Sequence, residues 1–203
     1  MKLTKEFYSG KDVVKIAKGL LGKGLFTAIN GNVIGGMIVE TEAYSPKERG
    51  SHAYQNRMTN RNAVMFKEGG HAYVYLCYGI HNLFNVVTNV EGKADAVLIR
   101  ALEPVKGTQF MKENMKTIHE KRITSGPGKL TKALGIDRSH NALKVWSADL
   151  WLEDMNIKLK KNEIVSSPRV GIDYAGEDAL LPWRFSIKDN PWVSNPLPKL
   201  GKK

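Results

Sequence analysis

The sequence predicts an α+β fold, in which helices and strands are mixed without a regular strand–helix–strand order. Three observations support this prediction. One segment near the N-terminus has the apolar period of a helix, two pairs of segments have the residue types of hairpins, and no βαβ rhythm occurs. With 203 residues, 42% of them hydrophobic, the chain is long enough for a substantial core. We expect residues 1–203 to form a single domain.

Residues 9–22 carry the signals of a helix. Ser9 is the expected N-cap, and Asp12 lies in the first turn, where an acidic side chain is favourable. Gly22 ends the run. Between them, apolar residues follow the 3.6-residue period of a helix: Val13, Ile16, Ala17, Leu20 and Leu21.

The next segments predict a hairpin followed by a long loop. Residues 25–29 and 33–44 have strand composition, and the Asn30-Gly31 pair between them is typical of a tight type I′ turn. Residues 45–71 are polar and rich in Gly, Asn and Arg. They are expected to form a loop with one short helix, and a loop of that length in a compact domain is usually functional or disordered.

Three more strands follow by residue type. Residues 72–77 and 83–88 are expected to form two strands that pair around Gly79. Residues 96–99 are expected to form a short buried strand, with Arg100 directly after it.

Two helices and a series of short strands complete the expected elements. Met111, Met115 and Ile118 mark a helix with basic outer faces. A second helix begins at 125–129, buries Leu130, Ala133 and Leu134, and ends at Gly135. Short strands dominate from Trp146 onward, including the alternating Trp183, Phe185 and Ile187. The Pro- and Lys-rich residues 195–203 are expected to be a loose tail.

The chain is strongly basic, because 31 Lys and Arg stand against 20 Asp and Glu, a formal net charge of +11. Such a charge attracts polyanions, and nucleic-acid backbones are the commonest of these. A basic surface kept for solubility, or an acidic small-molecule or lipid partner, is the alternative. No apolar run has the ~20 residues of a membrane span, and Cys77 is the only cysteine. We therefore expect a cytoplasmic protein without a membrane partner.

The segment from Val39 to Tyr44 holds two nearby acids. Alternate residues of a strand share a face, so Glu40, Glu42 and Tyr44 project together. Paired acids beside an aromatic ring are typical of a glycosidase, in which a carboxylate activates water against a sugar C1. The alternative is a pair of solvent-facing strand residues balanced by lysines, and spacing alone favours that alternative.

The segment from Tyr73 to Gly79 contains three tyrosines. It is either a tyrosine-rich strand with satisfied hydroxyls, or a stacking platform whose Tyr78, just before Gly79, could wedge into a duplex. Residues 105–132 carry a local excess of basic residues, which is either a solvated helix face or a track for phosphates. The five histidines make no metal-ligand pattern, and no nucleotide-binding glycine motif occurs, so neither a metal nor a cofactor is expected.

Taken together, these segments resemble the alkyladenine DNA glycosylase family, also called 3-methyladenine or N-methylpurine DNA glycosylases. The likeness extends over nearly the whole chain. Each element alone is modest evidence for the family, but the number and order of the elements argue against a chance likeness. The elements are residues 39–44, His52, Arg61-Asn62 with Met65-Phe66, Tyr73-Val74-Tyr75 with Tyr78-Gly79 and Asn85, and residues 98–104, 125–130, 169–172, 174–177 and 191–194.

The resemblance implies a compact fold with a curved, mainly antiparallel sheet and a β-hairpin that enters the DNA minor groove. It also assigns roles to residues of this chain. Glu42 matches the general base and Arg100 its partner; Tyr44 and His52 match the residues that sandwich a flipped base, and Tyr75 and Asn85 line its edges. Tyr78 matches the intercalating wedge, while Arg57, Arg61, Met65 and Lys129 match positions at or near the DNA backbone.

The implied activity is hydrolysis of the N-glycosidic bond of damaged purines in double-stranded DNA, after the nucleotide is flipped out. The damaged bases are 3-methyladenine, 7-methylguanine, hypoxanthine and etheno-adenine. The resemblance further implies a monofunctional base-excision repair enzyme, without a lyase step, that acts as a monomer in a bacterial cytoplasm. Two alternatives remain: a non-catalytic lesion-binding module on the same fold, and an O-glycoside hydrolase that uses Glu40 with Glu42.

Overall fold

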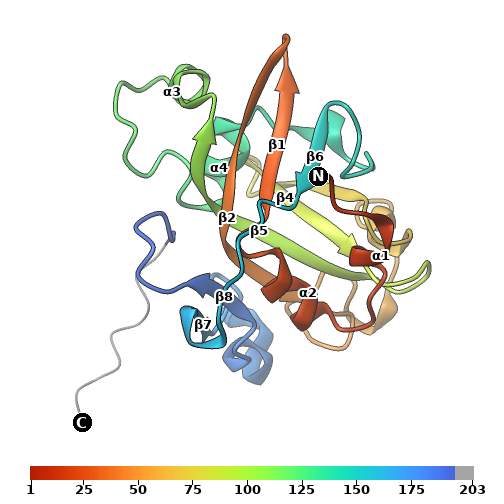
Figure 1. Cartoon of the computed structure of the whole chain (residues 1–203). Helices are drawn as coiled ribbons and strands as arrows, with labels where there is room; N and C mark the ends of the chain where they lie inside the picture. Colours follow the sequence, from red (N-terminus) through yellow and green to blue (C-terminus); the bar gives the residue numbers. More distant parts are fainter. Residues whose placement is uncertain (195–203) are drawn as a thin grey trace.

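The computed structural model describes residues 1–194, so the tail expected at 195–203 lies outside the described residues. Within that range an eight-stranded sheet forms the centre of the molecule, and helices pack against it (Figure 1). Every strand pair of this sheet is antiparallel. The predicted α+β class and the mainly antiparallel sheet are therefore confirmed. No helix of the described part is long and apolar enough to cross a membrane.

The elements alternate irregularly along the chain. The strands are β1 Gly24–Ile29, β2 Asn32–Tyr44, β3 Ala72–Cys77, β4 His81–Thr88, β5 Asp95–Lys106, β6 Leu150–Glu153, β7 Ile164–Ser167 and β8 Arg184–Ile187. The α-helices are α1 Lys5–Tyr8, α2 Val13–Leu20, α3 Thr108–Met115 and α4 Pro127–Ala133. Single turns of 3₁₀ helix are η1 Tyr54–Asn56, η2 Ala63–Phe66, η3 Arg138–His140 and η4 Lys161–Glu163, and η5 spans Asp173–Leu180.

The sheet order places β2 at the centre of the site described below. The strands follow the order β3-β4-β5-β2-β1-β6. Strand β5 runs along one edge of β2 from Gly35 to Tyr44. The other edge pairs first with β1 and then, at Glu40 to Glu42, with β8, which continues to β7. In Figure 1, β2 and β5 are the long strands that cross the molecule. The second half of β2 is thus enclosed by strands on both edges.

Apolar side chains from the helices and the sheet form one large core. Helix α2 packs on β2 and β5, and α4 packs on β4, β5 and α3. Leu20, Leu102 and Leu130 are fully buried in this core. A second, smaller cluster lies under the loop of residues 45–71 and includes Met65 and Phe66. The long loop is therefore packed by its own apolar side chains, and this fixes its shape.

The N-terminal helix prediction is right in place but wrong in its cap. Helix α2 begins after Asp12, whose carboxylate accepts the Lys15 N–H at 3.0 Å. Ser9 instead follows α1, a four-residue helix that the apolar pattern did not predict, and its hydroxyl donates to the Lys5 carbonyl. Asp12 is the cap because it immediately precedes the first helical residue, whereas Ser9 lies several residues upstream.

The two hairpins form as predicted, while three boundaries differ. Asn30 and Gly31 both have positive φ, as a type I′ turn requires. Strand β4 begins at His81 rather than residue 83. Strand β5 has twelve residues rather than four, because it pairs with both β2 and β4 and carries buried polar side chains that hide its strand pattern. Helix α3 ends at Met115, and Ile118, predicted within it, is 85% exposed beyond the left-handed Lys116.

Candidate active site

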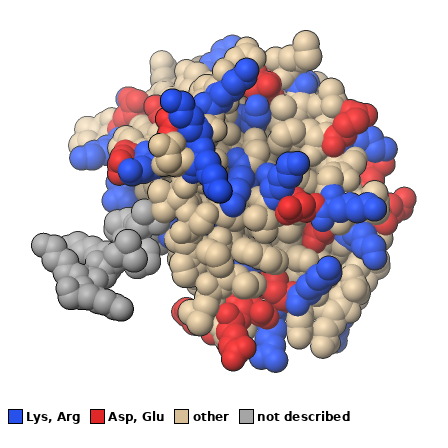
Figure 2. Space-filling view, turned by 60° about the horizontal axis from the view of Figure 1, so that its bottom comes forward, with Lys and Arg blue, Asp and Glu red and all other residues tan. Residues whose placement is uncertain are grey.

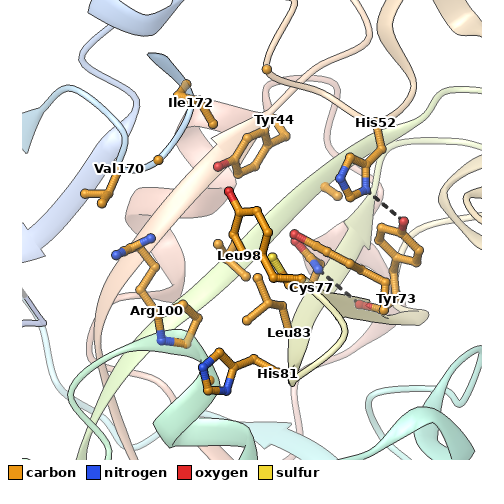
Figure 3. Close-up of a pocket in the computed structure, with 18 of the residues that line it drawn as sticks. Tyr44, His52, Tyr73, Cys77, His81, Leu83, Leu98, Arg100, Val170 and Ile172 are labelled. Atoms are coloured by element: carbon orange, nitrogen blue, oxygen red, sulfur yellow. Dashed lines mark hydrogen bonds between the residues drawn. The ribbon is translucent and has the colours of Figure 1, made fainter. Parts of the chain in front are cut away.

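A cavity of about 670 Å³ lies beside the β3–β4 hairpin (Figure 3). This volume is in the ~300–1,000 Å³ range of small-molecule pockets. Strands β2 to β5, the loop of residues 45–71, the start of α4 and the segment around Val170 all contribute to its wall. Of the site residues predicted from sequence, all but Glu42 and Arg57 line it: Tyr44, His52, Arg61, Met65, Tyr75, Tyr78, Asn85, Arg100 and Lys129.

Glu42 lies directly behind the cavity wall and is fully buried. Its Oε2 accepts the Tyr44 hydroxyl at 2.8 Å, and its Oε1 accepts the Val170 N–H at 2.8 Å. Arg100 Nη1 lies 3.2 Å from the same Oε1. All three neighbours are donors, so the carboxylate is held as an acceptor, which is the role of its ionised form. A carboxylate oxygen can accept about two hydrogen bonds, so the remaining capacity is on Oε2.

Arg100 reaches both acids because β5 bulges at this residue. Glu40 pairs with Ala101 and Thr41 pairs with Ile99, so Arg100 has no partner opposite it in the ladder. Bulges re-aim side chains and are frequent beside active sites. The Arg100 side chain consequently points between Glu40 and Glu42 while part of it faces the cavity (Figure 3).

Glu40 is also fully buried, and it does not line the cavity. Its Oε1 accepts hydrogen bonds from Arg100 Nε at 2.9 Å and Arg184 Nε at 2.6 Å. Burial alone would raise the pKa of Glu40, but the charges of Arg100 and Arg184 and the hydrogen bonds from Ser194 hold the pKa below its usual value. The interpretation of Glu40 and Glu42 as solvent-facing residues balanced by lysines is wrong: both are buried, and arginines balance them. An O-glycosidase cleft flanked by both acids is not formed either.

Aromatic side chains form the opposite part of the wall. His52 meets the Tyr75 ring edge-on with centroids 4.5 Å apart, and its Nδ1 lies 2.9 Å from the Tyr73 hydroxyl. Tyr73 and Tyr75 stack at 5.3 Å. Tyr44 faces the same cavity from β2 (Figure 3), with the Arg169 guanidinium on its ring at 4.7 Å. This arrangement leaves a space lined by flat rings, the surface that an extruded base would stack on.

Burial keeps these aromatic groups neutral. Burial raises the pKa of Tyr73 to about 12 and also raises the pKa of Tyr75. Burial of the imidazole, with the Arg61 charge nearby, lowers the pKa of His52 to about 4. At neutral pH the ring wall therefore carries no charge of its own.

This lowered pKa predicts a pH-dependent stability. The pKa of His52 in the folded state lies below the ~6.5 of an unfolded chain, so the unfolded state binds the proton first as pH falls. The contribution of His52 to the free energy of unfolding is fully present above pH 6.5 and is lost as pH falls towards 4. Because the His52 side chain is exposed on its outer side, solvent screening reduces the loss to ~1 kcal/mol.

Urea unfolding of wild type and His52→Gln at pH 7 and pH 4.5 measures this loss. Burial also lowers the pKa of His71, so the wild type is expected to lose more than His52 alone accounts for, and the difference between the two proteins isolates His52. If the free energy of unfolding falls equally in both proteins between pH 7 and pH 4.5, His52 does not cause the loss.

The loop that carries His52 is fixed by a residue to which sequence reasoning gave no role. Asn62 is 1% exposed. Its amide nitrogen donates to the His52 carbonyl at 2.8 Å and to the Arg57 carbonyl at 3.0 Å, while its oxygen accepts the Thr59 N–H. Tyr73 and Val170 are two further cavity residues without a predicted role. The only sequence signal for Asn62 was its place after Arg61 in the long loop. The Val170 contact has no sequence signal, because it is made by the backbone.

The tip of the β3–β4 hairpin projects from the cavity rim. Tyr78 is 87% exposed and Ile80 is 72% exposed, and Tyr78 has a φ of 50°. A bulky residue in the left-handed region is strained and is a hint of function. Helix α4 holds the hairpin close to its tip: Thr131 donates to the Asn82 carbonyl at 2.6 Å, and a Cβ on Gly128 would lie 2.8 Å from the His81 ring. Two apolar side chains are thus presented to solvent on an anchored hairpin.

The four residues predicted near a DNA backbone fall into two groups. Arg57, Arg61 and Lys129 are exposed, and Arg61 lies 5.2 Å from the Tyr75 ring centroid. Met65 is only 2% exposed and lies in the cavity wall, so it does not offer its side chain to a backbone. Figure 2 shows Lys and Arg side chains across one face of the molecule, with Asp and Glu mostly towards its edges. The net positive charge is therefore displayed on the surface.

Metal-ligating side chains do not gather in the described part of the chain. No group of three or more His, Cys, Asp or Glu within residues 1–194 could hold a metal ion. Cys77 and His81 are partners in the β3–β4 register, and both line the cavity.

Comparison with known proteins adds a family to this geometry. The model of the family described as Methylpurine-DNA glycosylase matches residues 6–191. Proteins from Natranaerobius thermophilus, Clostridium tetani and Methanocella arvoryzae are 45%, 44% and 45% identical to this chain. The matches cover 96%, 96% and 97% of this chain and 99%, 99% and 97% of those proteins. Each carries the name "Putative 3-methyladenine DNA glycosylase".

Proposed function

Because the chain belongs to the methylpurine-DNA glycosylase family, and is thus a DNA glycosylase, we propose that it hydrolyses the N-glycosidic bond of alkylated and deaminated purines in duplex DNA. The observation that carries this proposal is the placement of Glu42. Its carboxylate is buried behind the part of the cavity wall formed by Tyr44, Arg100 and Val170, is bonded only by donors, and keeps free acceptor capacity on Oε2. This arrangement suits a base that takes a proton from water.

The proposed reaction follows from these positions. The flipped purine lies between Tyr44 and His52, with Tyr75 along its edge. A water molecule donates to Glu42 Oε2 and attacks C1′ of the sugar. The C1′–O bond forms as the C1′–N9 bond breaks, the bonding electrons leave with the base, and the water proton goes to Glu42. Arg100 holds Glu42 in place and balances its charge.

The ring wall fits the charge of the substrate. 3-Methyladenine and 7-methylguanine are positively charged in DNA, and a neutral His52 does not repel them. Departure of a cationic base needs little further help. Hypoxanthine and etheno-adenine are neutral and need protonation, for which solvent is the proposed source. The His52 main-chain N–H donates to no acceptor within residues 1–194. It is therefore available to an acceptor at the purine 6-position.

Asn85 is the proposed residue that discriminates against guanine. It is 5% exposed, and its amide nitrogen donates to the Tyr73 carbonyl at 3.1 Å, which fixes its orientation at the cavity wall. In this position it would crowd the 2-amino group of a normal guanine.

Several further properties belong to the same proposal. Tyr78 fills the space that the flipped nucleotide leaves in the minor groove, and Arg57, Arg61 and Lys129 contact phosphates. The enzyme acts in the cytoplasm as a monomer and leaves an abasic site without cutting the strand.

Base release from defined duplexes tests the proposal. Wild-type protein is incubated with duplexes that each hold one hypoxanthine, etheno-adenine or 7-methylguanine, and released bases are identified by mass spectrometry. We expect free base, and strand breaks only after alkali treatment. Breaks without alkali would contradict the monofunctional mechanism. Tight binding of every duplex without any released base would assign the protein to lesion binding instead.

A further inference from the structure

A buried charge network links the proposed active site to the segment of residues 190–194. Glu40 is its centre. The Ser194 N–H donates to Glu40 Oε2 at 2.7 Å, and the Ser194 hydroxyl donates to Glu40 Oε1 at 2.9 Å. Arg100 and Arg184 donate to the same Oε1. Each of these four residues is less than a tenth exposed, so water contributes little to holding them.

This network occupies one side of the Arg100 guanidinium. Its Nε bonds Glu40, and its Nη2 donates to the Ser194 hydroxyl at 3.3 Å. The third guanidinium nitrogen, Nη1, is not used by these contacts and lies 3.2 Å from Glu42 Oε1. A guanidinium is rigid and planar, so fixing two of its nitrogens fixes the third. Since Arg100 lies at a bulge and lacks a ladder partner, the orientation of its side chain depends on Glu40 and Ser194.

The segment that supplies Ser194 is itself anchored. The Asn190 amide donates to Glu103 at 2.7 Å, and its side-chain oxygen accepts the Trp192 N–H at 2.9 Å. Arg122 Nη2 donates to the Ser194 carbonyl at 3.0 Å. The backbone at Ser194 is therefore fixed, and it presents both the N–H and the hydroxyl of Ser194 to Glu40.

Glu40 forms ion pairs with both buried arginines of this region. Arg100 and Arg184 supply two positive charges, and Glu40 and Glu42 supply two negative charges, in a volume with almost no solvent. A buried charge that loses its partner is strongly destabilising. Glu40 is therefore needed to neutralise the buried arginines, although it has no direct role in the chemistry with a substrate.

We propose that Glu40 and Ser194 are positioning residues for the proposed reaction, which fix Arg100 against Glu42 so that residues 190–194 form part of the active site. The inference rests on the proposed role of Glu42 and deepens it. Glu40 and Ser194 touch no substrate; they act through Arg100.

Four variants of the full chain test this inference. Glu40→Gln removes the charge and keeps the shape, Glu40→Asp keeps the charge and shortens the reach, and Ser194→Ala removes the hydroxyl and keeps the N–H. Ser186→Ala is the matched control, because Ser186 is a buried serine opposite Glu40 in the β2–β8 ladder whose hydroxyl makes none of these contacts. Single-turnover base release, affinity for a duplex with an abasic-site analogue, and thermal unfolding are measured for each.

We expect Glu40→Gln to slow base release ~100-fold and Ser194→Ala ~10-fold, with duplex affinity within about threefold of wild type. Ser186→Ala is expected to release base at the wild-type rate. The affinity measurement shows that each variant is folded, and Ser194→Ala remains informative if Glu40→Gln proves unstable.

Rescue by the conservative variant separates positioning from general stability. Glu40→Asp keeps the charge that pairs with Arg100 and Arg184. It is therefore expected to release base faster than Glu40→Gln and more slowly than wild type, with duplex affinity unchanged in both variants.

Each result has a defined meaning. Wild-type rates in both Glu40→Gln and Ser194→Ala, with Glu42→Gln inactive, would overturn the inference and leave the proposed function intact. Slower release that follows a loss of folded protein, with Glu40→Asp no faster than Glu40→Gln, would also overturn it, because the network would then be structural only. A wild-type protein that releases no base would remove the proposed function itself.

Discussion

Replacement of Glu42 by glutamine is expected to slow base release from a hypoxanthine duplex by ~10³-fold in single turnover, because general-base catalysis contributes 10²–10⁴ in rate. The amide keeps the size of the carboxyl group, and its oxygen still accepts a hydrogen bond, but it cannot take a proton from water. The rate is measured with excess enzyme on a labelled duplex, followed by alkali treatment.

The control for this variant is Glu153→Gln, which changes the charge by the same amount on β6, outside the cavity wall. It should release hypoxanthine at the wild-type rate. Glu42→Gln should still bind the duplex at least as tightly as wild type, since it removes one negative charge near a polyanion. A Glu42→Gln enzyme that retains more than a tenth of the wild-type rate would exclude Glu42 as the base.

Replacement of Tyr78 by asparagine is expected to slow base release from a paired duplex by ~10–100-fold, because stacking of a base on an aromatic ring contributes ~1–3 kcal/mol. Asparagine tolerates the left-handed backbone that Tyr78 adopts, so the turn is preserved while the ring is lost. Tyr78 is 87% exposed, and the free energy of unfolding should therefore change little. Fluorescence of a 2-aminopurine beside the lesion reports the flipping step directly.

Two comparisons make this result specific. Tyr78→Phe keeps the ring and should retain the wild-type rate, whereas Ile118→Ala, which removes an equally exposed apolar side chain beyond α3, should have no effect. A lesion in single-stranded DNA needs no wedge, so Tyr78→Asn should match wild type on that substrate. If Tyr78→Phe is as slow as Tyr78→Asn, the hydroxyl and not the stacked ring is responsible.

Local patterns in the sequence were enough to predict much of the fold. The Asn30-Gly31 turn, the β3–β4 hairpin around Gly79 and the helix that begins at Pro127 each depend on neighbouring residues, and each is confirmed. The length of β5 could not be read in this way. Its strand pattern is interrupted by the buried Arg100 and the half-buried Glu103, whose partners lie on β2 and in the segment at 190–194.

The candidate site could likewise be predicted only where it depends on neighbouring residues. The alternation of Glu40, Glu42 and Tyr44 placed them on one face of β2, and the Tyr44–Glu42 contact and the shared Arg100 agree with that. Spacing alone nevertheless favoured a solvated pair, since nothing near residue 40 indicates that Arg184 will cover it. Burial here is produced by segments far along the chain, and a strand pattern contains no information on them.

The pairing of β8 with β2 has a consequence for the order of folding. It joins Glu40 to residues 144 positions away, and long-range pairing of this kind is slow to form because a large loop must first be closed. We therefore expect Glu40 to stay hydrated while the hairpins assemble and to be buried late, when β8 docks after the rate-limiting step. Interactions that form after the rate-limiting step act on the unfolding rate. The contacts of Arg184 and Ser194 should then determine how long the folded enzyme lasts and not how quickly it forms.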